Sequence, residues 1–175
     1  MIRRTLLAAS AFGAALLAVA APLPAAAHVT LDRSEMPADS SLRITLRVPH
    51  GCEGAATTGI RVQIPAELRE VKPMPLAGWT LNTVLGDVAV ASAGEHGAPT
   101  APVREVSWRG GNLPDAFYGE FVMRVRTPAE PGGTLVFPIV QECENGKVAR
   151  WIERRAAGGP EPRFPAYLVR ITPKN

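Results

Sequence analysis

Apolar and polar side chains alternate without a break in the stretch Ser41-Leu42-Arg43-Ile44-Thr45-Leu46-Arg47-Val48. An extended backbone places successive side chains on opposite faces, so this period of two predicts a strand with one buried face and one solvated face. Leu42, Ile44, Leu46 and Val48 form the face expected to be buried. Half-buried strands of this kind belong to antiparallel sheets. The stretch therefore predicts a β-fold built from amphipathic strands.

Other short runs with strand character follow along the chain. They span residues 60–64, 103–108, 118–125, 135–143, 147–153 and 167–171, and Asn145-Gly146 is a hairpin turn pair between two of them. We expect Gly110-Gly111 to end the 103–108 run, one helical turn at 66–71, and loops at 86–102 and 155–165. This pattern predicts an all-β protein: a single antiparallel β-sandwich, immunoglobulin-like or cupredoxin-like, with negligible helix outside the signal peptide.

Residues 1–27 have the three parts of a secretory signal peptide. Arg3 and Arg4 form a positive start, an uncharged run rich in Leu and Ala follows, and Ala25-Ala26-Ala27 supplies the small residues of a cleavage site. We expect cleavage after Ala27, export to the periplasm or the medium, and one domain over 28–175. The alternative is an uncleaved N-terminal anchor. No second apolar run is long enough to cross a membrane, so we expect no stable membrane anchor after cleavage.

The charge balance gives no support to a nucleic-acid partner. The chain has 19 Lys and Arg against 16 Asp and Glu, and loss of two arginines with the signal leaves 17 − 16 = +1. The sequence shows no clustered basic stripe with interleaved aromatic residues. We therefore expect that the exported domain does not bind nucleic acid.

The chain has two cysteines, Cys52 and Cys143, and both lie in the predicted domain. In an oxidising compartment an even pair is first interpreted as a disulfide. Closing a loop of about 90 residues stabilises a fold by roughly 4 kcal/mol in the chain-entropy model. The competing interpretation is a thiolate site for copper or zinc. A disulfide would remove both sulfurs from the set of metal ligands.

His28 becomes the first residue of the exported protein if cleavage follows Ala27. A histidine at an amino terminus carries a free α-amine beside its imidazole, and the amine and Nδ1 can chelate one metal ion. Nitrogen donors combined with an oxygen donor suit tetragonal Cu(II), which stands near the top of the divalent affinity order. An α-amine has an ordinary pKa of about 7.7–8.0, so metal binding must displace a proton and weakens as the pH falls. A histidine at this position is also compatible with chance.

A complete metal site needs further donors, and the sequence offers several carboxylates without selecting among them. These are Asp115, Glu120, Glu142, Glu144 and Glu153. His50 ends a strand two residues before Cys52, where a turn contact and a secondary metal contact both remain open. His96 lies in a polar loop, where a solvated side chain is the simpler interpretation. No nucleophile motif is present, so we predict no catalytic residues.

A set of short motifs stands in a specific order along the chain. They are His28-Val29-Thr30-Leu31, Arg47-Val48-Pro49-His50-Gly51-Cys52, Thr57-Thr58-Gly59-Ile60-Arg61-Val62-Gln63-Ile64-Pro65, Val71-Lys72-Pro73-Met74-Pro75 with Gly78-Trp79, Val106-Ser107-Trp108-Arg109-Gly110-Gly111, Leu113-Pro114-Asp115 with Tyr118-Gly119-Glu120-Phe121, Phe137-Pro138-Ile139-Val140-Gln141-Glu142-Cys143-Glu144 and Arg150-Trp151-Ile152-Glu153. The set resembles the YcnI-like family of bacterial extracytoplasmic β-sandwich proteins, often encoded near copper-handling genes. The resemblance extends over nearly all of 28–175.

The resemblance implies one Cu(II) ion per chain, held in a mono-histidine brace. Carried onto this sequence, His28 gives its amine and imidazole, Glu120 gives a carboxylate, and Trp151 lies close to the metal; Trp108 and Trp79 are alternatives for that tryptophan. It implies an exported protein of copper homeostasis, a chaperone or buffer rather than an enzyme. Other periplasmic copper-handling proteins are then the expected partners.

Two other functions remain open at the level of sequence. A copper oxygenase with a histidine brace would need a second histidine, which only His50 or His96 can supply. A metal-free structural or interaction sandwich would make His28 incidental. Copper binding, oxidation of a polysaccharide and failure to retain copper are the observations that separate the three.

Overall fold

The strand predicted at 41–48 forms over those residues and lies inside a four-stranded antiparallel sheet of the computed structural model. The structure describes residues 28–87, 92–93, 99–156, 158–160 and 162–174. In this sheet β3 (Ser41–Val48) pairs with β1 (Thr30–Leu31) on one side and with β10 (Gly119–Arg126) on the other. Strand β5 (Arg69–Pro73) completes the order β1-β3-β10-β5. Short strand β1 is therefore an edge of the sheet.

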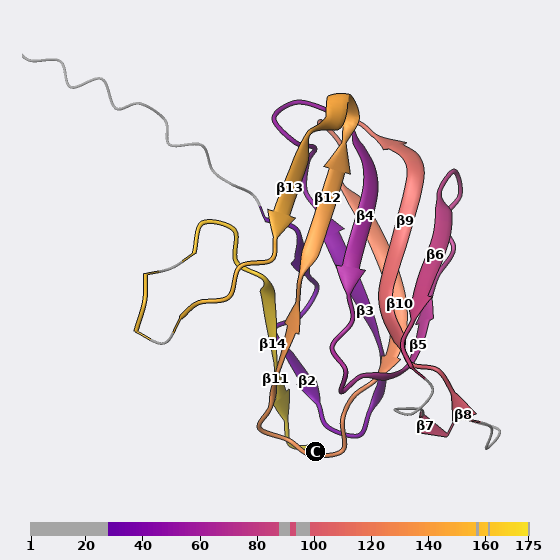
Figure 1. Cartoon of the computed structure of the whole chain (residues 1–175), viewed down its shortest axis with the longest axis vertical. Coiled ribbons are helices and arrows are strands. Elements are labelled where there is room, and N and C mark those ends of the chain that lie inside the picture. The colour runs from indigo at the N-terminus through magenta and orange to yellow at the C-terminus, as the bar shows by residue number, and fades with distance from the viewer. Residues whose placement is uncertain (1–27, 88–91, 94–98, 157, 161, 175) are drawn as a thin grey trace, which may run out of the picture.

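A five-stranded antiparallel sheet packs over the first one, as Figure 1 shows. Its order is β13 (Val148–Trp151), β12 (Ile139–Cys143), β4 (Thr57–Gln63), β9 (Val103–Leu113) and β6 (Thr80–Leu85). The expected hairpin turn at 145–146 connects β12 to β13 through a single 3-10 turn, Glu144–Gly146. Positive φ angles of 58° at Asn145 and 71° at Gly146 explain why this residue pair forms the turn.

A smaller sheet extends the sandwich at its lower end in Figure 1. It has the order β11 (Thr134–Phe137), β14 (Tyr167–Thr172) and β2 (Glu35–Pro37), and β14 runs parallel to β2. Strands β7 (Ser92–Ala93) and β8 (Pro99–Thr100) form a separate antiparallel pair within the loop predicted at 86–102. The remainder of that loop lies partly outside the described residues.

The apolar faces of the strands meet in one core between the sheets. Its fully buried large side chains include Ile44 and Leu46 from β3, Ile60 from β4, Trp108 from β9, and Phe121 and Met123 from β10. The prediction of an all-β sandwich is confirmed. Along the described residues no helix is long and apolar enough to cross a membrane.

Three local predictions were wrong. The run 135–143 is two strands, because Pro138 interrupts it and the chain passes from the sheet of β14 to that of β4. Strand β9 continues through Gly110 and Gly111. Gly111 lets the Trp79 ring pack directly against the strand, because a Cβ at this position would lie 2.0 Å from that ring. At 66–71 the chain makes a tight turn and then enters β5 instead of forming a helical turn.

Candidate metal centre

His28 lies at the edge of the sandwich, immediately before β1. The two residues on either side of Thr30 anchor this segment, because Val29 and Leu31 are 2% and 3% exposed and belong to the core. His28 and Thr30, which alternate with them, are half-buried. The imidazole of His28 lies against Trp151, with 4.5 Å between ring centroids and 43° between ring planes. The edge of one sheet thus meets the edge strand β13 of the other at this histidine.

Trp151 is almost completely buried and has an unsatisfied polar group. Its place on β13, opposite Ile139, directs the indole into the core, where it is 5% exposed. The buried Nε1 has no hydrogen-bond partner among the described residues. Phe164 packs its ring edge-on against the indole at 5.2 Å, and Arg163 lies over Phe164 at 5.1 Å. The loop between β13 and β14 therefore helps to fix the ring that contacts His28.

The other two tryptophans belong to a different part of the core. Trp108 is fully buried, and its Nε1 donates a hydrogen bond to the Met74 carbonyl at 2.9 Å. Both Trp108 and Trp79 pack against Phe121, with centroid distances of 5.5 and 4.9 Å. Within the described part of the chain, Trp151 is the tryptophan with a ring contact to His28. Sequence alone left Trp79 and Trp108 open for this role.

Glu120 lies two strands away from the histidine on the outer face of the same sheet. The register pairs Thr30 with Arg47 and Arg47 with Glu120, so these three side chains form a row across β1, β3 and β10. Two strand spacings separate β1 from β10 by about 10 Å. Glu120 is exposed, and no described hydrogen bond or ion pair joins it to His28. The two residues thus belong to one sheet, His28 before its edge strand β1 and Glu120 on the interior strand β10, with Arg47 of β3 between Thr30 and Glu120.

The carboxylate of Glu120 is held by the residue just before its strand. Tyr118 is two residues away on the same face of the chain and donates a hydrogen bond from its hydroxyl to Glu120 Oε1 at 2.6 Å. Burial raises the pKa of Tyr118, and the hydrogen bond to Glu120 and the negative charge of that carboxylate raise it further. Tyr118 therefore stays protonated as a donor, which leaves Oε2 of Glu120 available to another ligand.

Asp32 adds a second carboxylate on this face. It accepts a hydrogen bond from the Thr45 backbone N–H at 3.0 Å and pairs with Arg33 at 2.9 Å. Burial raises the pKa of Asp32, but the hydrogen bonds from Arg33 and Thr45 and the charges of Arg33 and Arg47 outweigh burial, so the pKa is lowered. Because Asp32 is already engaged by these groups, it is a poorer candidate for a metal ligand than Glu120.

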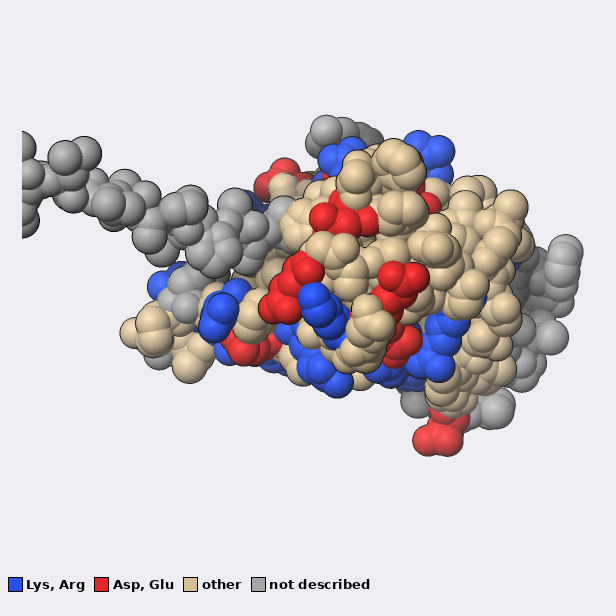
Figure 2. Space-filling view, turned by 90° about the horizontal axis from the view of Figure 1, so that it is seen from above, with Lys and Arg blue, Asp and Glu red and all other residues tan. Residues whose placement is uncertain are grey.

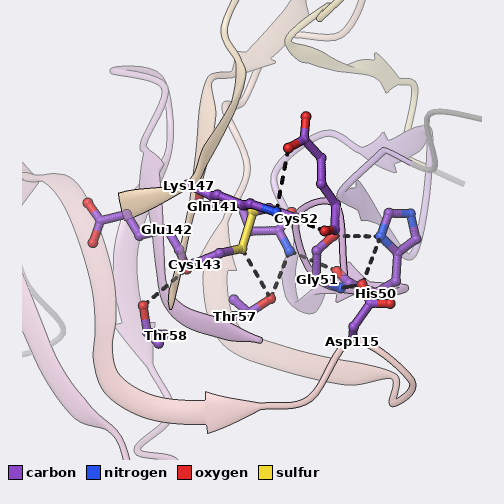
Figure 3. The surroundings of a disulfide bond; sticks show 11 residues. His50, Gly51, Cys52, Thr57, Thr58, Asp115, Gln141, Glu142, Cys143 and Lys147 are labelled. Atoms are coloured by element: carbon purple, nitrogen blue, oxygen red, sulfur yellow. Dashed lines mark hydrogen bonds and ion pairs between the residues drawn. A yellow bond between two sulfur atoms is a disulfide. The ribbon is translucent and has the colours of Figure 1, made fainter. Parts of the chain in front are cut away.

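His50 and its surroundings form a separate cluster at the disulfide (Figure 3). The His50 Nδ1 lies 2.6 Å from the Gly51 carbonyl oxygen and 4.0 Å from Asp115 Oδ1, which also accepts from the Gly51 N–H at 3.0 Å. Gln141 Nε2 donates to the His50 carbonyl oxygen and to Thr57 Oγ1, both at 2.8 Å. This histidine thus has the turn contacts expected of a strand end. His96 lies outside the described residues.

Cys52 and Cys143 form the predicted disulfide, and both are nearly buried. The bond joins the loop after β3 to the end of β12, and it leaves no free cysteine in the described chain. The competing thiolate site is therefore excluded while the bond is intact.

Two of the other carboxylates considered from the sequence, Glu142 and Glu153, have structural partners. Glu142 pairs with Arg61 at 2.9 Å and with Arg109 at 3.5 Å, and Glu153 Oε2 accepts from the Phe164 backbone N–H at 3.1 Å. Across the described residues, no three His, Cys, Asp or Glu side chains lie close enough to hold a metal ion.

A donor set made up of the His28 imidazole, the Glu120 carboxylate and, if cleavage occurs before residue 28, the new amine would be nitrogen-rich. Such a set would suit Cu(II) better than a harder cation. A terminal histidine supplies two donors from one residue, so a brace needs only two residues where a site built from side chains alone needs three. The indole N–H of Trp151, whose ring contacts His28, is buried and has no hydrogen-bond partner among the described residues. A ligand bound at this edge could accept a hydrogen bond from it.

Comparison with known proteins gives a family and a fold. The model of a family described as a domain of unknown function, DUF1775, matches residues 28–171. The crystal structure of an uncharacterized protein from Nocardia farcinica, described as having an immunoglobulin-like fold, is 29% identical, with a TM-score of 0.63. The match covers 82% of this chain and 97% of that one. The sandwich is therefore immunoglobulin-like.

More distant similarity extends to a cohesin module of a family 33 glycoside hydrolase from Clostridium perfringens. It is 13% identical, covers 84% of this chain and 97% of that one, and has a TM-score of 0.47. No curated protein matches the sequence.

Proposed function

Since the chain belongs to the DUF1775 family, which is the YcnI-like family that its sequence resembles, we propose that it is an exported Cu(II)-binding protein of copper handling. In this proposal one Cu(II) ion is the cargo of each chain. It is bound by the α-amine and imidazole of His28 and by the carboxylate of Glu120, with Trp151 beside it. The role is that of a chaperone or buffer in the periplasm or the medium, not that of an enzyme.

The observation that carries the proposal is the position of His28. The family match begins at this residue, which is also the first residue after the predicted cleavage site. Its imidazole lies against Trp151, and its strand belongs to the same sheet as Glu120. Cleavage would add the α-amine to this edge. Two of the three residues transferred from the family motifs, His28 and Trp151, are thus in contact at the edge of the sandwich, and Glu120 lies two strands from β1 in the same sheet.

Each residue has a distinct part in this proposal. His28 chelates, and the buried Val29 next to it limits the movement of the terminus. Glu120 supplies a negatively charged oxygen, oriented by Tyr118. Trp151 covers one side of the imidazole and restricts the approach of water from the core side. Three protein donors leave at least one position of a tetragonal ion for a partner's ligand, which suits transfer of the metal to another protein.

The test compares two forms of the domain. One begins at His28, and the other carries one additional residue before it, so that the amine beside the imidazole becomes an amide. The first form should bind one Cu(II) with nitrogen hyperfine structure in its EPR spectrum, and the second should bind at least a hundredfold more weakly. His50→Ala in the first form is the matched control and should leave the affinity unchanged. Equal affinity of the two forms would rule out the brace.

An oxygenase is less well supported by the same geometry. It needs a second histidine at the metal, whereas His50 is engaged with the Gly51 carbonyl and faces Asp115. His28, His50 and Glu120 do not form a metal-binding group in the described chain. Copper-dependent oxidation of a polysaccharide by the loaded protein would favour the enzyme over the handling protein.

A further inference from the structure

Three basic side chains lie directly opposite one another across neighbouring strands. The register pairs Arg124 of β10 with Arg43 of β3 on one side and with Lys72 of β5 on the other. Residues paired in this way point to the same face of a sheet, and this row lies on the outer face, where all three are exposed. Strands are spaced by about 4.8 Å, so three cations stand within about 10 Å.

More basic residues flank this row on the same face. Arg47 lies in the row of Thr30 and Glu120, and Arg126 is paired in register with Arg69. We call the six residues together the basic face: Arg43, Arg47, Arg69, Lys72, Arg124 and Arg126. Their positions in the sequence are separated by up to 83 residues, 126 − 43, which is why no basic stripe is visible in the sequence.

The carboxylates that face this surface lie at its two ends. Asp39 pairs with Arg126 at 2.6 Å, and the charge of Glu70 also acts on Arg126. At the other end are Glu120 and Asp32, near Arg47. In the central row, Arg43 and Arg124 form no hydrogen bond or ion pair with any described residue, whereas Lys72 has an interaction of its own.

The outer face of the other main sheet shows the contrast. There Arg61 of β4 pairs with Glu142 at 2.9 Å and with Glu105 at 3.9 Å, and Arg109 pairs with Glu142 at 3.5 Å. Opposite charges alternate on that face, so it is internally neutralised. The end of the sandwich also shows acidic and basic side chains intermixed (Figure 2). Positive charge without a carboxylate partner among the described residues is therefore a property of Arg43 and Arg124, on the face formed by β3 and β10.

Like charges placed directly opposite destabilise a sheet, so folding alone does not account for the central row. The surface also lacks the apolar centre of a typical protein interface. None of the exposed large apolar side chains belongs to β3, β5 or β10, and Val122, between Glu120 and Arg124 on this face, is 9% exposed. A regularly spaced array of cations on one face of a sheet complements the negative charge of an array of phosphates.

We propose that the basic face docks the protein on an anionic lipid bilayer, with Arg43 and Arg124 against the phosphate head groups. Adsorption is electrostatic and reversible, since β3, β5 and β10 carry no exposed large apolar side chain; the exposed Phe117 and Tyr118 lie at the end of the face, before β10. It orients the five-stranded sheet away from the membrane. His28, at the edge shared by both sheets, stays open to the aqueous phase. The proposal does not depend on copper binding.

The test measures sedimentation of the purified exported protein with vesicles of phosphatidylcholine alone and with 30% phosphatidylglycerol, at about 0.05 M and 0.15 M salt. The double variant Arg43→Gln/Arg124→Gln should bind the anionic vesicles about 30-fold more weakly, from about 1 kcal/mol for each basic residue. Arg150→Gln/Arg154→Gln removes the same charge from exposed positions outside the basic face and is the matched control, expected to change binding less than threefold.

Binding should also fall as salt rises, because screening shortens the range of these charges. Equal losses in the two double variants would mean that only net charge matters and would overturn the proposal. The same conclusion would follow from equal binding to neutral and anionic vesicles. Tighter binding to poly-L-glutamate than to anionic vesicles at equal charge concentration would identify an acidic protein segment as the partner, which also overturns it.

Discussion

Replacing Cys52 and Cys143 together by alanine opens a covalent loop whose ends are 91 residues apart in sequence. In the chain-entropy model the loop restricts the unfolded chain by 2.1 + 1.5R ln 91, about 15.5 cal/mol/K, which is about 4.6 kcal/mol at 25 °C. Residual structure in the unfolded chain lowers this figure. We therefore expect the double variant to lose about 2–5 kcal/mol of unfolding free energy.

Urea unfolding of the oxidised protein, of the protein reduced with a thiol, and of the Cys52→Ala/Cys143→Ala variant measures this loss. The reduced protein and the variant should agree within about 1 kcal/mol, because both lack the same loop constraint. A midpoint equal to that of the oxidised protein would refute the entropic reasoning. It would mean that the native contacts around Gln141 and Thr57 hold the loop without the covalent bond.

Copper binding by the same variant tests the assignment of the donors. Nitrogen and oxygen donors from His28 and Glu120 do not involve sulfur, so the folded variant should bind Cu(II) with an affinity within about threefold of the parent protein. Loss of binding under conditions where the variant is folded, as shown by its far-ultraviolet circular dichroism, would contradict that assignment and revive the thiolate site.

Four further substitutions separate the contributions to binding and stability. Glu120→Gln should weaken Cu(II) binding at least tenfold in a competition titration without changing the melting temperature, because the side chain is exposed; unchanged affinity would remove Glu120 from the ligand set. Tyr118→Phe loses the 2.6 Å hydrogen bond to that carboxylate and should weaken copper binding about tenfold, with the EPR nitrogen couplings retained. Arg124→Gln should raise the unfolding free energy by about 0.2–1 kcal/mol, because it relieves repulsion between neighbouring cations. A lower unfolding free energy than that of the parent, measured by chemical denaturation, would contradict this. A hydrogen bond from Arg126 and its charge lower the pKa of Asp39, so Asp39→Asn should be less stable than the parent at neutral pH, and the difference should vanish as the pH falls through the lowered pKa; a difference that persists in acid would exclude the ion pair as its cause.

The sequence was most informative where one physical requirement determines the residue pattern. Strand β3 was predicted to the residue because half-burial imposes strict alternation, and the turn at 145–146 because positive φ angles select Asn and Gly. Pro138 and Gly111 were misinterpreted because each has two uses. Pro138 marks a change of sheet inside one apolar run, and Gly111 makes room for an indole within a strand.

The candidate site could be predicted only in part, for a related reason. A histidine just after a predicted cleavage site is visible in the sequence, but its neighbours depend on which strands form edges. The contact between His28 and Trp151 requires β1 and β13 to be edges on the same side of the sandwich, and nothing in either segment encodes that. The Tyr118–Glu120 hydrogen bond could have been predicted from the sequence, since residues two apart in an extended chain share a face. The basic face could not have been predicted in this way, because its cations come from three strands that are distant in the sequence.

A metal site at a chain terminus faces a physical difficulty, since the first residues of a domain usually fray unless something ties them down. Here the chain from residue 28 is held by two means. Thr30 and Leu31 pair with β3, and Val29 and Leu31 are buried in the core. Alternation then leaves the imidazole of His28 on the surface, where Trp151 fixes one side of it. If cleavage occurs before His28, the new amine is created on a segment that is already ordered, and chelation has little backbone entropy left to lose. The short strand β1 is therefore the element on which a terminal chelate would depend.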